Sequence, residues 1–177
     1  MAQAKHLTSE AARLAANMSF TKAAGVAATA NIGHAALLVS HDGAQTAVVA
    51  NAALALAALA ASDLPSSMAQ WKQPSGTTGF YSHPTAASLG VASVTVYYVF
   101  GVTAAGTVKV VQGTYDNQAL PNGAVGKSVI PDVPSGNFTP VTVMKIVSTA
   151  AFVPGTTTTA GVSTFKDVAV LPVGSTF

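Results

Sequence analysis

Residues 93–113 read SVTVYYVFGVTAAGTVKVVQG, and this stretch decides the fold. In its first half every second residue is apolar, so that one face carries Val94, Val96, Tyr98, Phe100 and Val102. Such alternation of β-branched and aromatic residues predicts a half-buried strand. The second half places Val108 and Val110 on one face, with Lys109 and Val111 on the other. The stretch therefore predicts two antiparallel strands joined by a tight turn.

The hydrophobic pattern also predicts the register of this hairpin, because a slip by one residue would turn the apolar face to solvent. Pairing Val102 with Val108 leaves residues 104–106, Ala-Ala-Gly, as the loop. Three-residue loops favour a type I turn that ends in a residue with left-handed backbone. Gly106 stands at that position, so we predict a positive φ there.

Charged side chains are scarce in the chain. Of its 177 residues 8% are charged and 50% are hydrophobic, whereas a typical soluble domain is about 25% charged. We therefore expect a surface of Ser, Thr, Asn and Gln side chains, much of it buried in an assembly. The second face of the hairpin, with Tyr97, Val99 and Val111, is then expected to be covered by aromatic residues of the linker or by a neighbouring subunit.

The same composition excludes several classes of partner and site. The net charge of +2 includes no cluster of Lys and Arg, which argues against nucleic-acid binding. The absence of cysteine excludes disulfides and thiolate metal sites. Residues 44–61 are uncharged and long enough to approach a membrane span. Most of them are alanine, and Gln45 and Asn51 interrupt them, so we predict no membrane insertion.

Composition divides the chain into three regions. Residues 1–64 are alanine-rich and largely helical by prediction, with good helix formers at 11–17. Residues 65–90 are rich in proline and glycine and form a linker, and residues 91–177 form a β domain. The predicted fold class is α+β, with a largely helical N-terminal region followed by a small antiparallel β-sandwich or barrel.

Two further strands are predicted in the β domain. Residues 139–148, TPVTVMKIVS, are apolar on both faces, as expected inside a sheet. Residues 164–171, TFKDVAVL, are a second strand, which ends at Pro172. Residues 36–62 leave two alternatives open. A hairpin of 36–39 with 46–49 can turn at His41-Asp42-Gly43, or a helix can run over 44–61 with coiled-coil spacing.

Catalytic and metal-binding patterns are not found in the sequence. Gly123–Ser128, GAVGKS, resembles a phosphate-binding loop, but Pro121 replaces the first glycine and Pro131 prevents the helix that must follow. The four histidines lack metal-ligand spacing, and the six carboxylates are scattered singly. Asp116 and Asn117 could bind calcium within a longer loop, yet EF-hand spacing is missing. We predict a protein that is not an enzyme and carries no metal or cofactor.

Three stretches of the β domain carry a resemblance to a known family. They are VVQGTYDNQ at 110–118, IPDVPSGNFTPVTVMKIV at 130–147, and AFVPGTTTTAGVSTFKDVAVLP at 151–172. Together with the hairpin they make residues 93–177 similar to β domains of tailed-bacteriophage virion proteins, which include capsid decoration proteins, head fibres and related tail or neck proteins.

The resemblance implies a structural protein of the virion, either a capsid decoration (cement) protein or a head fibre, which stabilises the shell by burying surface across capsomers. Its implied partners are two further copies of itself, as a homotrimer, and the major capsid protein or another virion protein. Its implied location is the capsid surface, after synthesis in the host cytoplasm. A tail, baseplate or neck component, or a carbohydrate-binding receptor module that uses the polar turn Thr156–Thr159, stays an alternative.

We expect residues 1–62 to make the oligomer and capsid contacts and the β domain to face outward. The apolar residues expected at this assembly interface are Leu7, Leu14, Leu37, Leu38, Val48, Val49, Leu56 and Leu59.

Overall fold

The structure is a computed structural model. It describes residues 20–22, 32–34, 37–41, 44–49, 51–54, 57–60, 63, 83–120, 123–134, 138–152 and 163–167.

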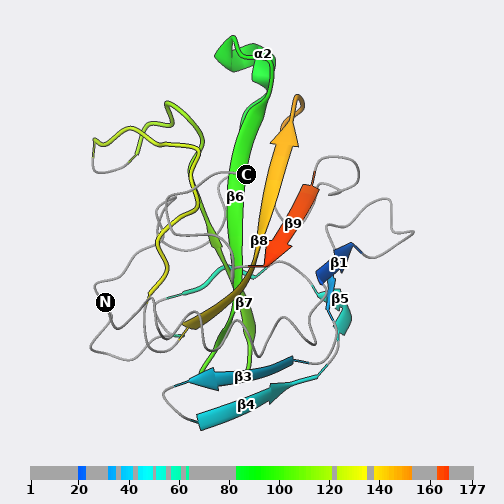
Figure 1. The fold of residues 1–177 in the computed structure, drawn as a ribbon. Helices are drawn as coiled ribbons and strands as arrows, with labels where there is room; N and C mark the ends of the chain where they lie inside the picture. Colours follow the sequence, from blue (N-terminus) through cyan, green and yellow to red (C-terminus); the bar gives the residue numbers. More distant parts are fainter. Residues whose placement is uncertain are drawn as a thin grey trace.

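An antiparallel sheet forms the centre of the C-terminal half (Figure 1). Its long central strand, β6 (Val94–Thr103), pairs with β7 (Val108–Gln112) on one side and with β8 (Phe138–Ser148) on the other. The short strand β9 (Ser163–Asp167) adds to β8. The strand predicted at 139–148 is confirmed, and the one predicted to begin at Thr164 is confirmed up to Asp167.

The hairpin between β6 and β7 has the predicted register. Val102 pairs with Val108, and residues 104–106 form the loop. The Thr103 N–H donates to the Thr107 carbonyl at 2.9 Å, and the Gly106 N–H donates to the Thr103 carbonyl at 2.9 Å. Gly106 has φ 79°, as predicted for a residue that ends such a turn.

A bulge interrupts the pairing of β6 with β8 at Gly101. Phe100 pairs with Thr142 while Gly101 pairs with Pro140, so the residue of β8 between these two has no pairing partner on β6. A Cβ at position 101 would lie 2.4 Å from Cζ of Phe138 and 2.6 Å from the Thr139 carbonyl oxygen. The ring of Phe138 therefore occupies the space that any other residue at position 101 would need.

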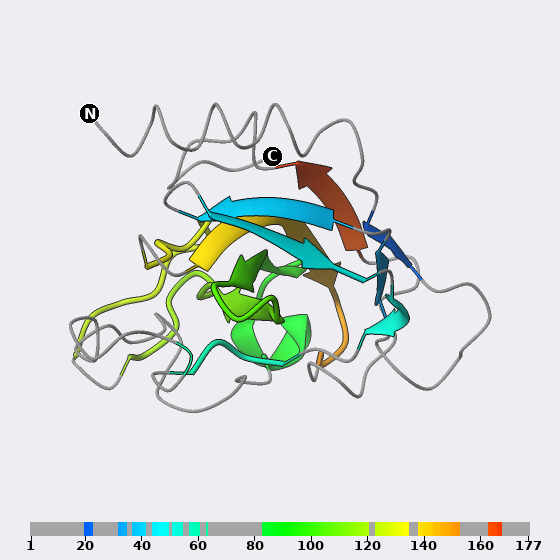
Figure 2. The same ribbon diagram turned by 90° about the horizontal axis from the view of Figure 1, so that it is seen from below.

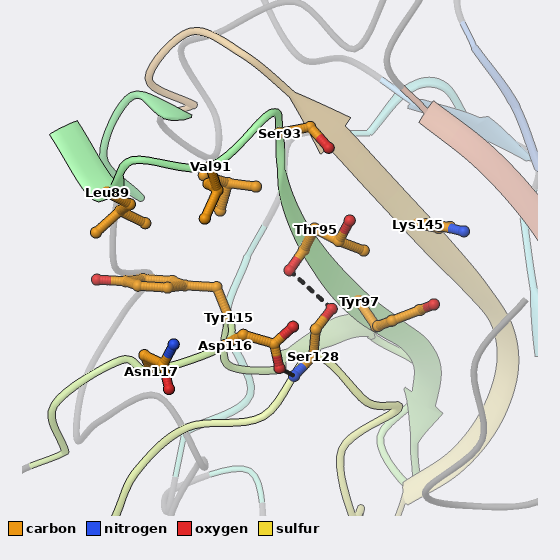
Figure 3. Close-up of a pocket in the computed structure, with 11 residues that line it drawn as sticks. Leu89, Val91, Ser93, Thr95, Tyr97, Tyr115, Asp116, Asn117, Ser128 and Lys145 are labelled. Atoms are coloured by element: carbon orange, nitrogen blue, oxygen red, sulfur yellow. Dashed lines mark hydrogen bonds between the residues drawn. The ribbon is translucent and has the colours of Figure 1, made fainter. Parts of the chain in front are cut away.

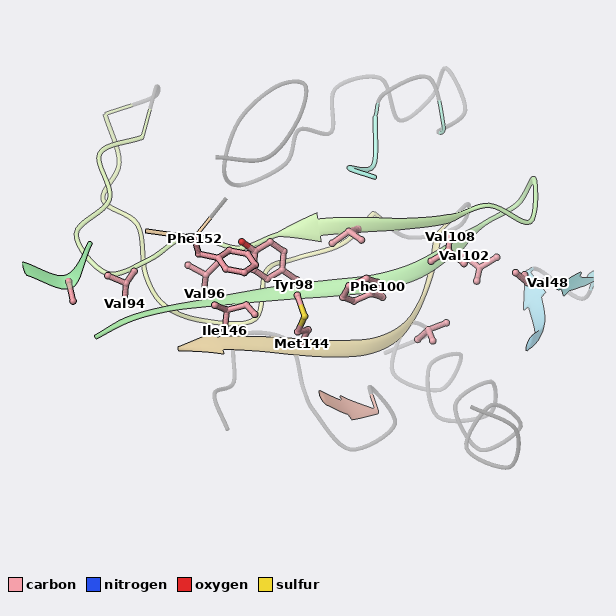
Figure 4. Close-up of a cluster of buried hydrophobic side chains, with 13 residues drawn as sticks. Val48, Val94, Val96, Tyr98, Phe100, Val102, Val108, Met144, Ile146 and Phe152 are labelled. Atoms are coloured by element: carbon pink, nitrogen blue, oxygen red, sulfur yellow. The ribbon is translucent and has the colours of Figure 1, made fainter. Parts of the chain in front are cut away.

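One face of the sheet packs into the larger of two hydrophobic clusters (Figure 4). Tyr98 and Phe100 lie at its centre and have 0% exposure. Burial raises the pKa of the Tyr98 hydroxyl well above its ordinary value, and a hydrogen bond from Gln112 Nε2 at 3.1 Å partly offsets this effect. This first cluster comprises Val48, Ala86, Val94, Val96, Tyr98, Phe100, Val102, Val108, Val110, Val141, Met144, Ile146 and Phe152.

The opposite face of the sheet is buried too. Tyr97 is 2% exposed and Val111 is 0% exposed. Tyr97 and Val111 are covered by residues of a second hydrophobic cluster within the same chain. The expected cover by a neighbouring subunit is therefore not needed at these positions. The linker aromatics Trp71, Phe80 and Tyr81, the other expected cover, lie outside the described residues. This second cluster comprises Leu59, Tyr97, Val99, Val111, Ile130, Phe138 and Val143.

Residues 57–60 occupy the outer edge of β7. The Leu59 N–H donates to the Val110 carbonyl and the Val110 N–H donates to the Ala57 carbonyl, each at 2.9 Å, in a parallel bridge. Asp63 strengthens the attachment, because its Oδ2 lies 3.3 Å from Nζ of Lys109 on β7. The last part of the predicted N-terminal region thus hydrogen-bonds to the sheet of the predicted β domain.

All described residues before position 55 except Val49 lie in short strands. β3 (Leu37–His41) and β4 (Ala44–Val48) form an antiparallel hairpin, which confirms the hairpin alternative. β1 (Phe20–Lys22), β2 (Ile32–His34) and β5 (Asn51–Leu54) form a second small sheet. The alternative helix over 44–61 is therefore wrong where β4 and β5 lie, because backbone pairing there overrides the helix propensity of alanine. Seen from below, β3 lies over β8, which it contacts (Figure 2).

The described part of the chain holds no helix that is both long and apolar enough to cross a bilayer. Its helix α2 (Ala86–Leu89) is a single turn. The Thr85 hydroxyl caps it by accepting from the Ser88 N–H at 3.3 Å, and Gly90 ends it with φ 67°. The predicted helix formers at 11–17 and most of the linker lie outside the described residues, so the boundaries of the predicted regions stay predictions.

Replacement of Gly101 by alanine tests the close approach of Phe138. We expect Gly101→Ala to lower the free energy of unfolding by about 2–3 kcal/mol, because the added methyl group overpacks a site bounded by backbone. Urea denaturation of the purified protein measures this. In the control Gly123→Ala, which has φ +79° and open space around its Cβ, only backbone strain of about 1 kcal/mol is expected. A Gly101→Ala protein as stable as the wild type would contradict the packing.

Candidate functional site

A pocket of about 300 Å³ lies beside the first residues of β6 (Figure 3). Small-molecule sites usually span about 300–1,000 Å³, so this pocket has the size for one small ring rather than a chain of rings. Its walls come from the end of α2, from β6, from β8 and from the loop between Thr114 and Ser128, here called the pocket loop. The lining residues are Leu89, Val91, Ser93, Val94, Thr95, Tyr97, Tyr115, Asp116, Asn117, Ser128 and Lys145.

The pocket loop is closed by hydrogen bonds within itself. Thr114 Oγ1 donates to the Lys127 carbonyl at 2.7 Å and accepts from the Lys127 N–H at 2.9 Å. Further along the loop, the Gly126 N–H donates to the Gln118 carbonyl at 2.8 Å. These bonds satisfy backbone groups that a loose loop would leave to water. The loop therefore has a defined shape without a ligand.

Two hydrogen bonds tie the carboxylate of the pocket to β6. Asp116 Oδ1 accepts from the Ser128 N–H at 2.9 Å, and Ser128 Oγ donates to the Thr95 carbonyl at 3.0 Å (Figure 3). No other bond of the Asp116 carboxylate occurs in the described part of the chain. Its second oxygen is therefore free to accept a hydrogen bond from a ligand, while the first holds the side chain in place.

Asn117 stands beside this carboxylate in an unusual backbone conformation. Its φ is 63°, a region in which asparagine is more frequent than other residues with side chains. Its N–H donates to the Gly126 carbonyl at 3.2 Å, which holds the turn. The residue is exposed, and its amide adds one acceptor and two donors to the lining of the pocket.

The upper wall of the pocket is apolar. Tyr115 is half-buried, and its ring projects beneath Leu89 and Val91 in Figure 3. Leu89 is 41% exposed and Val91 is 47% exposed, which makes them two of the most exposed large apolar side chains of the described residues. The pocket thus combines an apolar wall with a polar one.

A lysine supplies the positive charge of the pocket. Lys145 on β8 pairs in register with Tyr97 on β6, and its Nζ lies 6.0 Å from the centre of the Tyr97 ring. At this distance the ammonium is attracted to the face of the ring. Figure 3 shows Lys145 on the far side of the β6 strand from Asp116. The two opposite charges of the lining are therefore held apart.

The chemistry available in this pocket is hydrogen bonding and apolar contact. The described residues contain no group of three or more His, Cys, Asp or Glu side chains that could hold a metal ion. Residues 123–130, which include the GAVGKS sequence, are followed by no helix. The described residues 131–134 thus lack the helix that a phosphate-binding loop requires.

The residues predicted for an assembly interface are spread over several environments. The side chains of Val48 and Leu59 are buried in the first and second clusters of the chain's own core. Val49, at the end of β4, is 83% exposed. Leu37 and Leu38 lie on β3. The remaining three lie outside the described residues, and they are Leu7, Leu14 and Leu56.

Only a weak local pattern in the sequence points to this pocket. The pattern at Asp116 and Asn117 suggests calcium ligands, and it does not link these residues to Ser128 or Leu89, which line the same pocket. These residues lie far apart in the chain, and no periodic pattern links them. The one local hint is a half-buried Tyr followed by an exposed Asp and Asn directly after a buried strand.

Comparisons with protein-family models, with curated proteins and with solved structures find no match for this chain.

A second unusual polar group, His83, lies in the core rather than in the pocket. Its ring stacks on Phe152 with 5.2 Å between the ring centres, and it is 2% exposed. Neither ring nitrogen has a hydrogen-bond partner among the residues that the structure describes. Burial lowers the pKa of His83 from 6.5 to about 4, so the ring is neutral in the folded protein at pH 7.

This histidine makes stability depend on pH. An unfolded histidine binds a proton below about pH 6.5, whereas folded His83 does so only near pH 4. The free energy of unfolding should therefore fall by about 3 kcal/mol between pH 7 and pH 4 through this group alone. Denaturant unfolding at both pH values measures the fall.

The variant His83→Leu isolates that contribution. Other titrating groups act equally in both proteins, so the wild type should lose about 3 kcal/mol more than the variant over the same pH interval. Equal losses in the two proteins would show that His83 is not buried in the neutral form.

Proposed function

We propose that this protein is a non-enzymatic structural component of a tailed-phage virion, of the capsid decoration or head-fibre kind. It forms a homotrimer, and it binds the major capsid protein or another virion protein at the capsid surface. A position in the tail, baseplate or neck is the alternative, because a protein there would be expected to have the same composition.

The observation that carries this proposal is the scarcity of charge around an exposed apolar residue. Between Lys22 and Asp63 the only charged side chain is Asp42. Within that stretch Val49 is 83% exposed at the end of β4. A free surface of this composition has little to keep it in solution, and contact with another subunit would remove it from water.

The energy of such contacts is sufficient for a stabilising role. A standard interface buries about 1,600 Å², and at about 25 cal/mol per Å² of apolar area the gross gain is on the order of tens of kcal/mol. Association costs reduce this gain considerably. Repetition over the many capsomers of a shell would still leave a large total effect.

The proposal includes the finer features of the predicted fold. Because both faces of the central sheet are buried, layers must lie on both of its sides. This supports a small sandwich or barrel around β6. The helical arm within residues 1–64 remains part of the same proposal, with the first residues as a contact to neighbours.

Val49 offers a test that leaves the core intact. Removal of residues 1–62 would also remove Val48 from the first cluster and Leu59 from the edge of β7. A point change on the surface is the better experiment. We expect Val49→Glu to weaken trimer formation and binding to virions at least about tenfold, because a carboxylate buried without a partner costs several kcal/mol.

Light scattering of the purified protein and co-sedimentation with virions that contain the chain measure the two effects. Val125→Glu is the matched control, because Val125 is 60% exposed on the pocket loop. It should trimerise and bind as the wild type does. If Val49→Glu behaves like this control, or if the wild-type chain is monomeric and does not sediment with particles, the proposal is wrong.

A further inference from the structure

We propose that the pocket beside β6 binds one ring of a neutral saccharide. This inference goes beyond the structural role and does not depend on it. It concerns a different part of the chain from the polar turn Thr156–Thr159, which lies outside the described residues.

The polar wall of the pocket suits the hydroxyl groups of a sugar. Asp116 has one oxygen engaged with the Ser128 N–H at 2.9 Å and the other unengaged. The Asn117 amide beside it can both donate and accept. A carboxylate and an amide that line one pocket can bind neighbouring hydroxyls, because hydroxyls donate to the carboxylate and accept from the amide N–H groups. Hydrogen bonds to an ionised oxygen are the stronger ones.

The apolar wall suits the remaining surface of the same ligand. A sugar ring presents C–H groups on its faces and hydroxyls around its edge. Tyr115, Leu89 and Val91 form a half-exposed apolar surface opposite the hydrogen-bonding groups. Tyrosine contributes apolar contact area at a low cost in side-chain entropy. A purely polar ligand would leave this wall without a partner, and a purely apolar ligand would strip water from Asp116.

Size and charge narrow the ligand to a neutral one. The volume of about 300 Å³ holds one ring. Asp116 disfavours an anionic ligand at the polar wall, and Lys145 disfavours a cationic one at the opposite end. The two charges sum to zero but lie apart, and an uncharged polyhydroxylated ring meets neither repulsion.

The site is formed before any ligand binds. The double hydrogen bond of Thr114 to Lys127 and the bond from Ser128 Oγ to the Thr95 carbonyl hold the pocket loop on β6. Because these groups are already ordered, binding would cost little side-chain and loop entropy. A single small ring then binds weakly, and stronger attachment would come from several copies on one surface.

Titration of the full-length protein with methyl glycosides of glucose, galactose, mannose and N-acetylglucosamine, followed by NMR, tests the inference. We expect at least one of these probes to give saturable shifts with a Kd on the order of millimolar. The shifts should centre on the amides of residues 115–117 and 128. Sialic acid and glucosamine serve as charged comparison ligands and should bind at least several-fold more weakly.

Asp116→Asn is the decisive variant. It keeps an oxygen for the Ser128 N–H and changes the unengaged acceptor into a donor, so the fold should persist while affinity falls about tenfold or more. Asp132→Asn is the matched control, because Asp132 is exposed and does not line the pocket. It should bind the glycoside as the wild type does.

Three results would overturn the inference. They are the absence of saturable binding for every neutral glycoside, equal affinity of Asp116→Asn and wild type, and tighter binding of a charged comparison ligand. None of these bears on trimer formation or virion binding, which Asp116→Asn should leave unchanged. Failure here is therefore distinguishable from failure of the proposed structural role.

Discussion

Burial of β6 on both of its faces is the constraint on which the rest of the structure depends. Seven of its ten residues belong to two hydrophobic clusters, with Tyr98 in the first and Tyr97 in the second. A strand buried on both sides needs cover from two layers. Leu59 and Ile130, from segments far apart in the chain, supply part of one layer, and Phe152 supplies part of the other. The fold therefore depends on bringing apolar residues from distant segments onto both faces of β6.

The same strand links the core to the candidate binding site. The pocket lies near the start of β6, where it is lined by half-buried Thr95 and by Ser93, which directly precedes the strand. The Thr95 carbonyl accepts from Ser128 and so anchors the pocket loop to a rigid strand. Sites that rest on strands hold their geometry more accurately than sites on loops alone. The pocket loop is therefore ordered by its attachment to a strand of the core. The core also contains the ring of His83, whose nitrogens have no hydrogen-bond partner among the described residues.

The features that could be predicted are those that depend on neighbours in the sequence. Alternation and the position of Gly106 were enough for the hairpin and its register, and a run apolar on both faces was enough for β8. Residues 44–61 show where such reasoning fails. Alanine favours a helix locally, but it also fits a strand, and the pairing of β4 with β3 decides between them. The chemistry of the pocket could not be predicted, because its groups meet only after the chain has folded.

The sequence by itself determined the central hairpin, the left-handed glycine in its turn, the buried strand β8 and the scarcity of charge. All of these follow from local periodicity, backbone sterics and composition. Only the tertiary structure decided that Leu59 covers the second face of β6, that Phe138 lies against Gly101, and that Asp116 is fixed through Ser128. The physical reason is that these contacts join residues distant in the chain, and their geometry is set by the packing of whole strands rather than by the preference of any one residue.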